Sequence, residues 1–289
     1  MHTSSKPLIS LITYSGLPDL DPDDRLVQTE LARRGVEAVP AIWNDPTIDW
    51  SKSSFSILRS TWDYHLHYLQ FLSWAEQVSA QTELLNPLPM IKWNSKKTYL
   101  ADLHEAGLPV IPTAWIHDSK GPSLVQILQE NQWNEAIIKP SIGLATAGVK
   151  RTNLENADND QVHVEMLLRS SEVMVQEYLP SVHQYGERAL IFIDGEYSHT
   201  VRKAPFQILA AAGQAGESRA QCNAQEIEIA KSFLDYLDTT PLYARVDLVR
   251  DAANQALLLE LELVEPSLFL AFAPESAEKF AEAILRRIS

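Results

Sequence analysis

The residues with the clearest potential for chemistry are an arginine and three carboxylates near the end of the chain. Arg245 and Asp247 alternate with apolar residues in the first of two predicted strands within 242–264. Glu260 and Glu262 alternate with leucines in the second strand. Because side chains two apart in a strand share one face, each pair of polar side chains is expected on the same side of its strand.

The spacing also predicts how these side chains face one another. If the strands form a hairpin symmetric about 253–254, Arg245 faces Glu262 and Asp247 faces Glu260. Facing Cβ atoms lie roughly 5 Å apart, and like charges there are destabilising unless something neutralises them. The pattern therefore predicts a hard cation such as Mg²⁺, commonly shared with substrate phosphates, and hence a nucleotide. The alternative is a solvent-facing hairpin whose ion pair contributes under about 1 kcal/mol.

A second segment has the features of a phosphate site. Lys139 ends the predicted apolar strand 135–139, and a loop of small residues, 140–148, follows it with Ser141 and Gly143. Small residues allow backbone N–H groups to approach phosphate oxygens closely. The spacing is not that of a P-loop, so a simple hairpin is the alternative.

Lysines near a predicted helix start give a further phosphate candidate. Asn94 is expected to cap a helix over 95–106, which places Lys96 and Lys97 where the helix dipole disfavours cations. A bound phosphate would relieve that mismatch. Surface lysines are the alternative.

Three other short segments carry candidate ligands. Arg59 and Asp63 follow the predicted strand 54–58, and Arg202 and Lys203 end another strand, so that either set could hold a substrate carboxylate or lie on the surface. A further apolar strand ends in a segment whose backbone could read an adenine edge or could simply be a strand end. That segment consists of Gln176, Glu177, Tyr178 and Leu179.

The elements that position these residues fall into an α/β arrangement. Residues 1–93 alternate strand and helix signals, which is typical of βαβ units and a parallel sheet, and the chain becomes strand-rich after residue 110. The expected strands are 8–14, 36–41, 54–58, 110–116, 135–139, 149–152, 173–178, 188–193 and 197–203, with helices at 22–34, 66–78, 95–106, 224–237 and 277–288.

Composition excludes several classes of protein. The 289 residues are 45% hydrophobic and 21% charged, which does not fit a disordered or fibrous chain. The formal net charge of -14 argues against broad attraction to nucleic acid or anionic membranes. The single cysteine excludes an internal disulfide. No apolar run reaches about 18 residues, so a cytoplasmic protein is expected. A homo-oligomer is compatible with the sequence.

In their order along the chain, these segments resemble the ATP-grasp superfamily, in particular ligases similar to glutathione synthetase. The resemblance implies an ATP-grasp fold, α/β (α+β), with a Rossmann-like domain over 1–93, a small lobe with the phosphate loop over 94–178 and a C-terminal lobe with the metal site over 179–289. The matching motifs are Leu85-Asn86-Pro87, Asn94–Lys97, Gly107-Leu108-Pro109, Lys139 with its loop, Gln176–Leu179 and the acidic hairpin.

The resemblance also implies roles for the candidate residues. ATP would be bound by Lys96, Lys139, Ser141, Gly143, Gln176, Glu177, Tyr178, Leu179 and Glu187, with Glu187 at the ribose. Mg²⁺ would be held by Asp247, Glu260 and Glu262, catalysis would involve Arg245 and Lys203, and the substrate would contact Arg59, Asp63 and Arg202. The usual acidic-x-Asn metal motif appears here as Glu260-Leu261-Glu262, which makes Glu265 a further metal candidate.

Two segments, 58–64 and 262–269, look like the branch of D-cycloserine-forming cyclo-ligases. That likeness implies activation of a small amino-acid-like carboxylate, O-ureido-D-serine in that branch, as an acyl phosphate. An amine-type nitrogen would then close a ring. The alternatives are an intermolecular carboxylate–amine ligase, such as a peptide or amino-acid ligase, and a nucleotide-binding regulator without activity.

Overall fold

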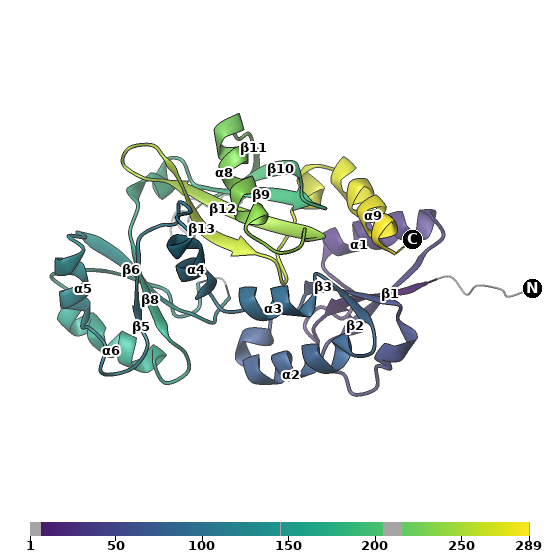
Figure 1. Ribbon diagram of the computed structural model, residues 1–289, viewed down its shortest axis with the longest axis horizontal. Helices are drawn as coiled ribbons and strands as arrows, with labels where there is room; N and C mark the ends of the chain where they lie inside the picture. The colour runs from purple at the N-terminus through teal and green to yellow at the C-terminus, as the bar shows by residue number, and fades with distance from the viewer. Residues whose placement is uncertain (1–6, 145, 205–215, 289) are drawn as a thin grey trace, which may run out of the picture.

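The computed structural model describes residues 7–144, 146–204 and 216–288 and contains three β-sheets (Figure 1). Each sheet is built from a different stretch of the chain, and the three sheets lie within the three predicted domain ranges. In Figure 1 the first sheet lies at the right, the second at the left and the third above and between them.

The first sheet is parallel, with strand order β2-β1-β3-β4. Parallel neighbours need crossover connections, and helices supply them. Asp21 accepts a hydrogen bond from the Asp23 N–H and caps the first helix, which starts with a proline as predicted. The elements are β1 (Leu8–Thr13), α1 (Pro22–Arg33), β2 (Glu37–Ile42), η1 (Trp50–Lys52), β3 (Phe55–Ser60), η2 (Tyr64–Leu66), α2 (Tyr68–Ser79) and β4 (Glu83–Leu85).

The second sheet is antiparallel, with order β5-β8-β6-β7. Two helices that the sequence analysis did not identify pack on each other, and their apolar residues share one core cluster with this sheet. The elements are β5 (Thr113–Ile116), α5 (Leu124–Glu130), β6 (Glu135–Pro140), β7 (Lys150–Asn153), α6 (Ala157–Leu167) and β8 (Val173–Glu177).

The third sheet has order β11-β10-β9-β12-β13, and all its pairs are antiparallel. Strand β12 is buried along almost its whole length because it lies inside the sheet and is covered on both faces. The elements are η3 (Pro180–His183), β9 (Glu187–Ile193), β10 (Glu196–Lys203), β11 (Glu217–Ala220), α8 (Ala224–Asp235), β12 (Tyr243–Arg250), β13 (Ala256–Glu262), η4 (Leu270–Phe272) and α9 (Glu275–Arg287).

The prediction of a single helix over 95–106 is wrong in its start and in its cap. Instead of one helix capped by Asn94, two short helices form, α3 (Leu88–Asn94) and α4 (Tyr99–Glu105). The Asn94 side chain is used elsewhere: its Nδ2 donates to the Leu261 carbonyl at 2.8 Å, and its Oδ1 accepts from the Leu263 N–H at 2.7 Å. Asn94 therefore joins the linker to the end of β13.

Packing crosses the predicted domain boundaries at two places. Helix α4 belongs to the predicted 94–178 domain, yet Tyr99, Leu100 and Leu103 share a core cluster with β12 and β13. Helix α9 belongs to the last predicted domain, yet it packs on α1 of the first (Figure 1). The three parts are consequently held together by shared apolar cores.

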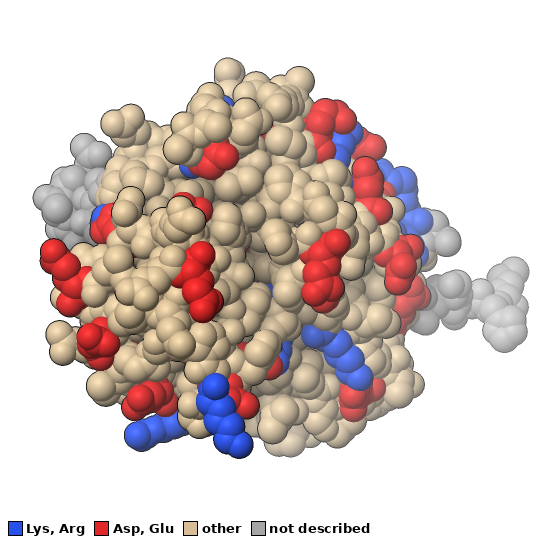
Figure 2. All heavy atoms as spheres, turned by 60° about the vertical axis from the view of Figure 1, so that its left-hand side comes forward, with Lys and Arg blue, Asp and Glu red and all other residues tan. Residues whose placement is uncertain are grey.

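The surface agrees with the acidic composition. Figure 2 shows Asp and Glu side chains spread over the visible face, with fewer Lys and Arg among them. Within the described ranges, none of the helices combines the length and the apolar composition needed to cross a membrane.

Arg59, at the end of β3, forms a buried contact between the first and third parts. Its Nε donates to Asp24 Oδ1 at 2.8 Å and its Nη2 donates to the Pro266 carbonyl at 3.0 Å. The guanidinium also lies over the rings of Tyr243 and Phe280, 4.7 and 5.6 Å from their centroids. Both members of the Arg59–Asp24 ion pair are only 3% exposed.

We expect Arg59→Met to lower the free energy of unfolding by about 3–5 kcal/mol, because it leaves the buried Asp24 carboxylate without its cation. Arg33→Met is the matched control: Arg33 is 69% exposed and pairs with Glu30 on the same helix, so its loss should cost under about 1 kcal/mol. Urea unfolding of the three proteins measures both changes. Equal effects of the two substitutions would contradict the structural role of Arg59.

Candidate active site

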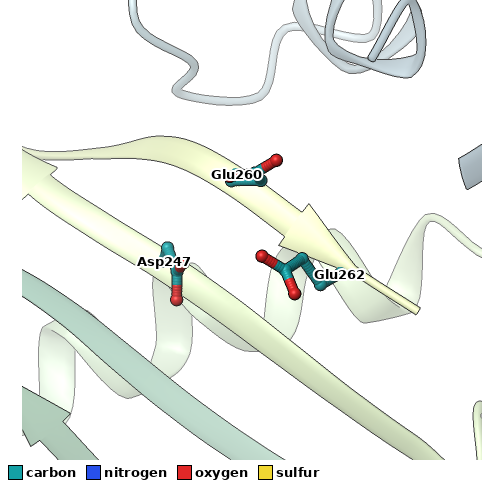
Figure 3. Close-up of side chains that lie close together, drawn as sticks. All are labelled: Asp247, Glu260 and Glu262. Atoms are coloured by element: carbon teal, nitrogen blue, oxygen red, sulfur yellow. The ribbon is translucent and has the colours of Figure 1, made fainter. Parts of the chain in front are cut away.

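The acidic hairpin has the register that the alternation predicted. Arg245 on β12 faces Glu262 on β13, and Asp247 faces Glu260. The register shifts by one residue after Asp247, so that Leu248 faces Leu258 and Leu259 forms a bulge. Figure 3 shows that the three carboxylates come from these two neighbouring strands and lie close together. The symmetric hairpin is thus confirmed for the charged pairs and ends at the bulge.

Asp247 is fully buried between two cations. Its carboxylate accepts hydrogen bonds from Arg245 at 2.9 and 3.0 Å and from Lys203 Nζ at 2.9 Å. Burial disfavours its charge, but Arg245 and Lys203 more than compensate and lower the pKa of Asp247. The same attraction raises the pKa values of Arg245 and Lys203, although burial opposes it. Asp247 is therefore ionised at neutral pH.

The two glutamates of β13 have opposite pKa shifts. Glu260 pairs with Lys97 at 2.5 Å, and although burial opposes ionisation, Lys97 and Lys139 lower the pKa of Glu260 to about 2. Glu262 pairs with Arg245, but burial and the neighbouring Glu260 and Asp247 carboxylates raise its pKa to about 7. Near neutral pH, Glu262 is therefore about half protonated, whereas Glu260 is ionised.

This group fits a hard metal ion. Asp247, Glu260 and Glu262 each offer an oxygen, and these oxygens lie within 4.8 Å of one another. Oxygen donors of this kind suit Mg²⁺, which needs only one or two carboxylates when substrate phosphates and water complete its coordination. Burial, more than the neighbouring carboxylates, raises the pKa of Glu262, and Arg245 only partly offsets both effects.

A cavity of about 540 Å³ opens over this group, within the usual size of a small-molecule site. Side chains from all three parts of the chain line it. Its polar, charged and aromatic lining includes Trp62, Tyr64, Lys97, Lys139, Glu187, Lys203, Arg245, Glu260, Glu262, Glu265, Ser267 and Phe269. Its small and apolar lining includes Gly143, Leu144, Val149 and Leu259.

Lys139 lies in the cavity as the sequence analysis expected, and its partner is uncharged. Its Nζ donates to Gln176 Oε1 at 3.0 Å, and no ion pair of Lys139 is found among the described residues. Burial lowers its pKa, with partial opposition from Glu260 and Glu187. A buried ammonium without a bound carboxylate is a suitable ligand for phosphate oxygens.

The structure places Lys96 outside the cavity and Lys97 inside it. Lys96 Nζ pairs with Glu172 at 2.7 Å, whereas Lys97 pairs with Glu260 and its Nζ donates to the Gly143 carbonyl at 3.3 Å. The structure thus brings Lys97, and not the predicted Lys96, to the cavity. The break between α3 and α4 sets which of the two lysines points inward.

Some of the predicted ATP ligands lie near the cavity without lining it. Ser141 is fully buried, and its carbonyl accepts the Lys97 N–H at 2.8 Å, which fixes that lysine. The N–H groups of Glu177 and Tyr178 donate to Pro112 and Glu135 carbonyls, so they are not free for adenine. Gln176 contacts Lys139, and Leu179 packs in a small apolar cluster. Gly143 and Glu187 do line the cavity, where Glu187 pairs with Lys203 at 3.0 Å.

The three predicted substrate ligands do not reach the cavity. Arg59 is used in the buried contact with Asp24, and Asp63 accepts a hydrogen bond from Trp43 Nε1 at 2.7 Å. Arg202 donates to the carbonyls of Tyr185 and Gln184. Each of these side chains is bound to a structural partner and lies outside the cavity lining, and a role for them in substrate binding stays a prediction.

The cavity is also lined by residues that the sequence analysis did not assign to substrate. Trp62 and Tyr64 come from the loop after β3, and Glu265, Ser267 and Phe269 come from the segment after β13. The only sequence signal was the density of aromatic and polar residues in 59–64 and the carboxylate at Glu265. Burial, and next the nearby Glu262, raise the pKa of Glu265 to about 8.

Comparison with known proteins identifies two domains. Residues 9–86 match the family model described as D-cycloserine synthetase DcsG, N-terminal domain, and residues 107–266 match prokaryotic glutathione synthetase, ATP-grasp domain. The chain is 34% identical to the cycloserine biosynthesis protein DcsG of Streptomyces lavendulae, with 97% of this chain and 99% of that protein aligned.

Solved structures agree with the sequence matches. The crystal structure of D-cycloserine synthetase DcsG is similar with a TM-score of 0.89 and 30% identity, and the match covers 98% of this chain and 100% of that one. The D-alanine–D-alanine ligase of Bacillus anthracis, solved with ATP, has a TM-score of 0.68 at 14% identity over 97% of this chain and 96% of its own. The latter likeness shows the fold alone.

We expect Mg²⁺ to stabilise the protein more strongly at pH 8 than at pH 6. Glu262, with a pKa of about 7, must lose its proton to coordinate a metal, and it is about one-tenth ionised at pH 6 and about nine-tenths at pH 8. Isothermal titration with MgCl₂ should show an affinity roughly five- to tenfold higher at pH 8. Glu262→Gln should remove this pH dependence, and an unchanged dependence in that variant would contradict the assignment.

Proposed function

The chain belongs to the ATP-grasp ligases, and we propose that it uses Mg-ATP to activate the carboxylate of a small amino-acid-like substrate for attack by an amine-type nitrogen. The observation that carries this proposal is the cavity itself. Four cationic side chains line it together with Glu260 and Glu262 of the carboxylate group, and the third carboxylate, Asp247, is bound to two of those cations. Among the described lining residues, Lys139 is a partly buried cation without a carboxylate partner.

The roles of this chain's residues follow from their positions. Lys97 and Lys139 would bind the ATP phosphates, and Arg245 would stabilise the charge that develops on the transferred phosphoryl group. Lys203 would support Arg245 by sharing the Asp247 carboxylate. A magnesium ion held by Asp247, Glu260 and Glu262 would neutralise phosphate charge. The apolar Val149 and Leu259 would contact the nucleotide base.

The reaction then needs no nucleophilic side chain. The substrate carboxylate attacks the γ-phosphorus, the bond to the bridging oxygen breaks, and ADP leaves with that electron pair. The nitrogen next attacks the acyl carbon, inorganic phosphate leaves and the nitrogen loses a proton. Catalysis of this kind depends on positioning and charge neutralisation, which is what the cavity provides.

The nitrogen is proposed to belong to the same substrate molecule, so that the product is a ring. The support is the full-length likeness to a cycloserine biosynthesis protein, including a match of residues 9–86 to the N-terminal domain of that type. Part of the substrate end, Trp62 and Tyr64, comes from this N-terminal domain. O-ureido-D-serine is accordingly the first substrate to test.

We expect Lys97→Gln to weaken ATP binding at least about tenfold, because a charge-assisted contact to phosphate contributes about 1.5–3 kcal/mol. Lys96→Gln is the matched control. Its side chain pairs with Glu172 outside the cavity, so ATP affinity should change less than about twofold. Titration calorimetry with a non-hydrolysable ATP analogue measures both. A larger effect of Lys96→Gln would contradict the assignment.

We expect ADP release from Mg-ATP to depend on an amino-acid-like substrate, tested with a panel of amino acids and O-substituted serines that includes O-ureido-D-serine. Asp247→Asn and Glu260→Gln should each reduce the rate at least about a hundredfold, because each removes a charge from the metal group.

Mass spectrometry of the product separates ring closure from joining of two molecules. Binding of ATP without ADP release for any member of the panel would support a regulator and contradict the ligase.

A further inference from the structure

One carboxylate in the cavity has no cation. Glu265 lines the cavity and is 9% exposed, yet its side chain forms no hydrogen bond or ion pair with any described residue. The carboxylates of the neighbouring acidic group each have a cationic partner: Asp247 has Arg245 and Lys203, Glu260 has Lys97, and Glu262 has Arg245. A buried carboxylate without a partner carries its charge only at a cost, and a cationic ligand would remove that cost.

Glu265 is also separate from the metal group. The oxygens that lie within 4.8 Å of one another belong to Asp247, Glu260 and Glu262, and Glu265 does not join them. A divalent ion needs several oxygen donors, and a single additional carboxylate does not form a second site of that kind. The geometry therefore does not place Glu265 in the metal group.

The segment that carries Glu265 is held rigidly by the first domain and by β12. Trp62 Nε1 donates to the Glu265 carbonyl at 3.1 Å, Arg59 Nη2 donates to the Pro266 carbonyl at 3.0 Å, and the Tyr243 hydroxyl donates to the Val264 carbonyl at 2.9 Å. Three consecutive carbonyls are thus fixed by side chains from other elements. The carboxylate is placed in advance, as a specific binding group requires.

The neighbours of Glu265 suit an organic cation. Trp62 and Tyr64 line the same cavity, and Trp62 Nε1 donates to the Glu265 carbonyl at 3.1 Å. Phe269 also lines it, but its ring already lies 5.7 Å from the Arg245 guanidinium. Aromatic faces attract ammonium groups, and a carboxylate next to such faces combines an ion pair with cation–π contacts. None of the described cations forms an ion pair with Glu265: Lys97 pairs with Glu260, and Lys139 donates to Gln176. A cationic group of the substrate would supply that partner.

We propose that Glu265 binds the ammonium group of the amino-acid substrate and thereby selects amino acids over the same acids without the amino group. This inference rests on the proposed function, because it assigns the substrate end of the same cavity. Glu265 acts here as a specificity residue. It takes no part in the phosphoryl transfer, and its loss should act on substrate binding and leave ATP binding unchanged.

The test compares two substrates that differ only in the amino group, O-ureido-D-serine and 3-(ureidooxy)propanoic acid. The kcat/KM ratio of the wild-type enzyme should favour the amino compound by at least about tenfold, since a charged hydrogen bond contributes about 1.5–3 kcal/mol. Glu265→Gln should reduce that ratio to about twofold or less by raising KM for the amino compound, with KM for ATP unchanged.

Two further variants complete the experiment. Glu265→Asp keeps the charge and should restore part of the preference. Glu196→Gln removes the same charge from an exposed position outside the cavity and should keep the wild-type ratio. A purely structural role of Glu265 would lower the rates with both substrates equally and leave their ratio as in the wild type.

Three outcomes would overturn the inference. A wild-type enzyme that uses both substrates equally would do so, as would a Glu265→Gln variant with an unchanged ratio. A Glu265→Gln variant whose main defect is a higher Mg²⁺ requirement would assign this carboxylate to the metal. Absence of ADP release from the wild-type enzyme with either compound, despite ATP binding, would instead count against the proposed function, and the inference would fail with it.

Discussion

The structure depends on the close approach of Asp247, Glu260 and Glu262 in a buried site. Three carboxylates whose oxygens lie within 4.8 Å of one another would repel each other strongly without nearby cations. Three different elements provide those cations: Lys97 comes from the linker between α3 and α4, Lys203 from the end of β10, and Arg245 from β12 itself. Because removal of one partner of a buried ion pair is strongly destabilising, the positions of these elements are tied to one another.

Asparagine side chains help to hold the parts in that arrangement. Asn86, after β4, donates to the Tyr243 and Leu263 carbonyls and accepts the Leu242 N–H, and Asn94 binds the backbone of Leu261 and Leu263. Both asparagines are buried, and both bind the backbone at the ends of the hairpin strands. The first domain is thereby fixed to the strands that carry the charges. Its loop after β3 can then form the substrate end of a cavity whose metal group lies in another domain.

The sequence predicted the hairpin well because its information is local. Period-two alternation and a single short turn determine which of Arg245, Asp247, Glu260 and Glu262 face one another, and the structure has those pairs. The bulge at Leu259 breaks the symmetry without a sequence signal such as glycine. The α/β class, the order of the three sheets and the ATP-grasp fold were also accessible from the sequence, the last through the order of its motifs.

The differences all concern side chains whose partners are distant in sequence. Arg59 has a side chain that could bind a substrate carboxylate. Its actual partner, Asp24, lies 35 residues earlier in the chain, and no local sequence pattern predicts that the two are in contact. The choice between Lys96 and Lys97 depends on a break between two short helices, and one residue changes the direction of a side chain by about a quarter of a turn. Alternation and capping rules describe neighbours along the chain, so they could not resolve either case.

The glutamate at position 262, where the family motif has asparagine, is explained by its surroundings. Arg245 faces Glu262 across the strand pair, and burial, followed by the nearby Glu260 and Asp247 carboxylates, raises the pKa of Glu262 to about 7. Near pH 7, Glu262 is protonated in about half of the molecules. In that form it carries no charge, and in this respect it resembles asparagine. If a cation were held here, as proposed, the proton would be released and the ionised carboxylate would be a stronger ligand than an amide. The substitution therefore adds no full charge to an already acidic site until a metal is present to balance it.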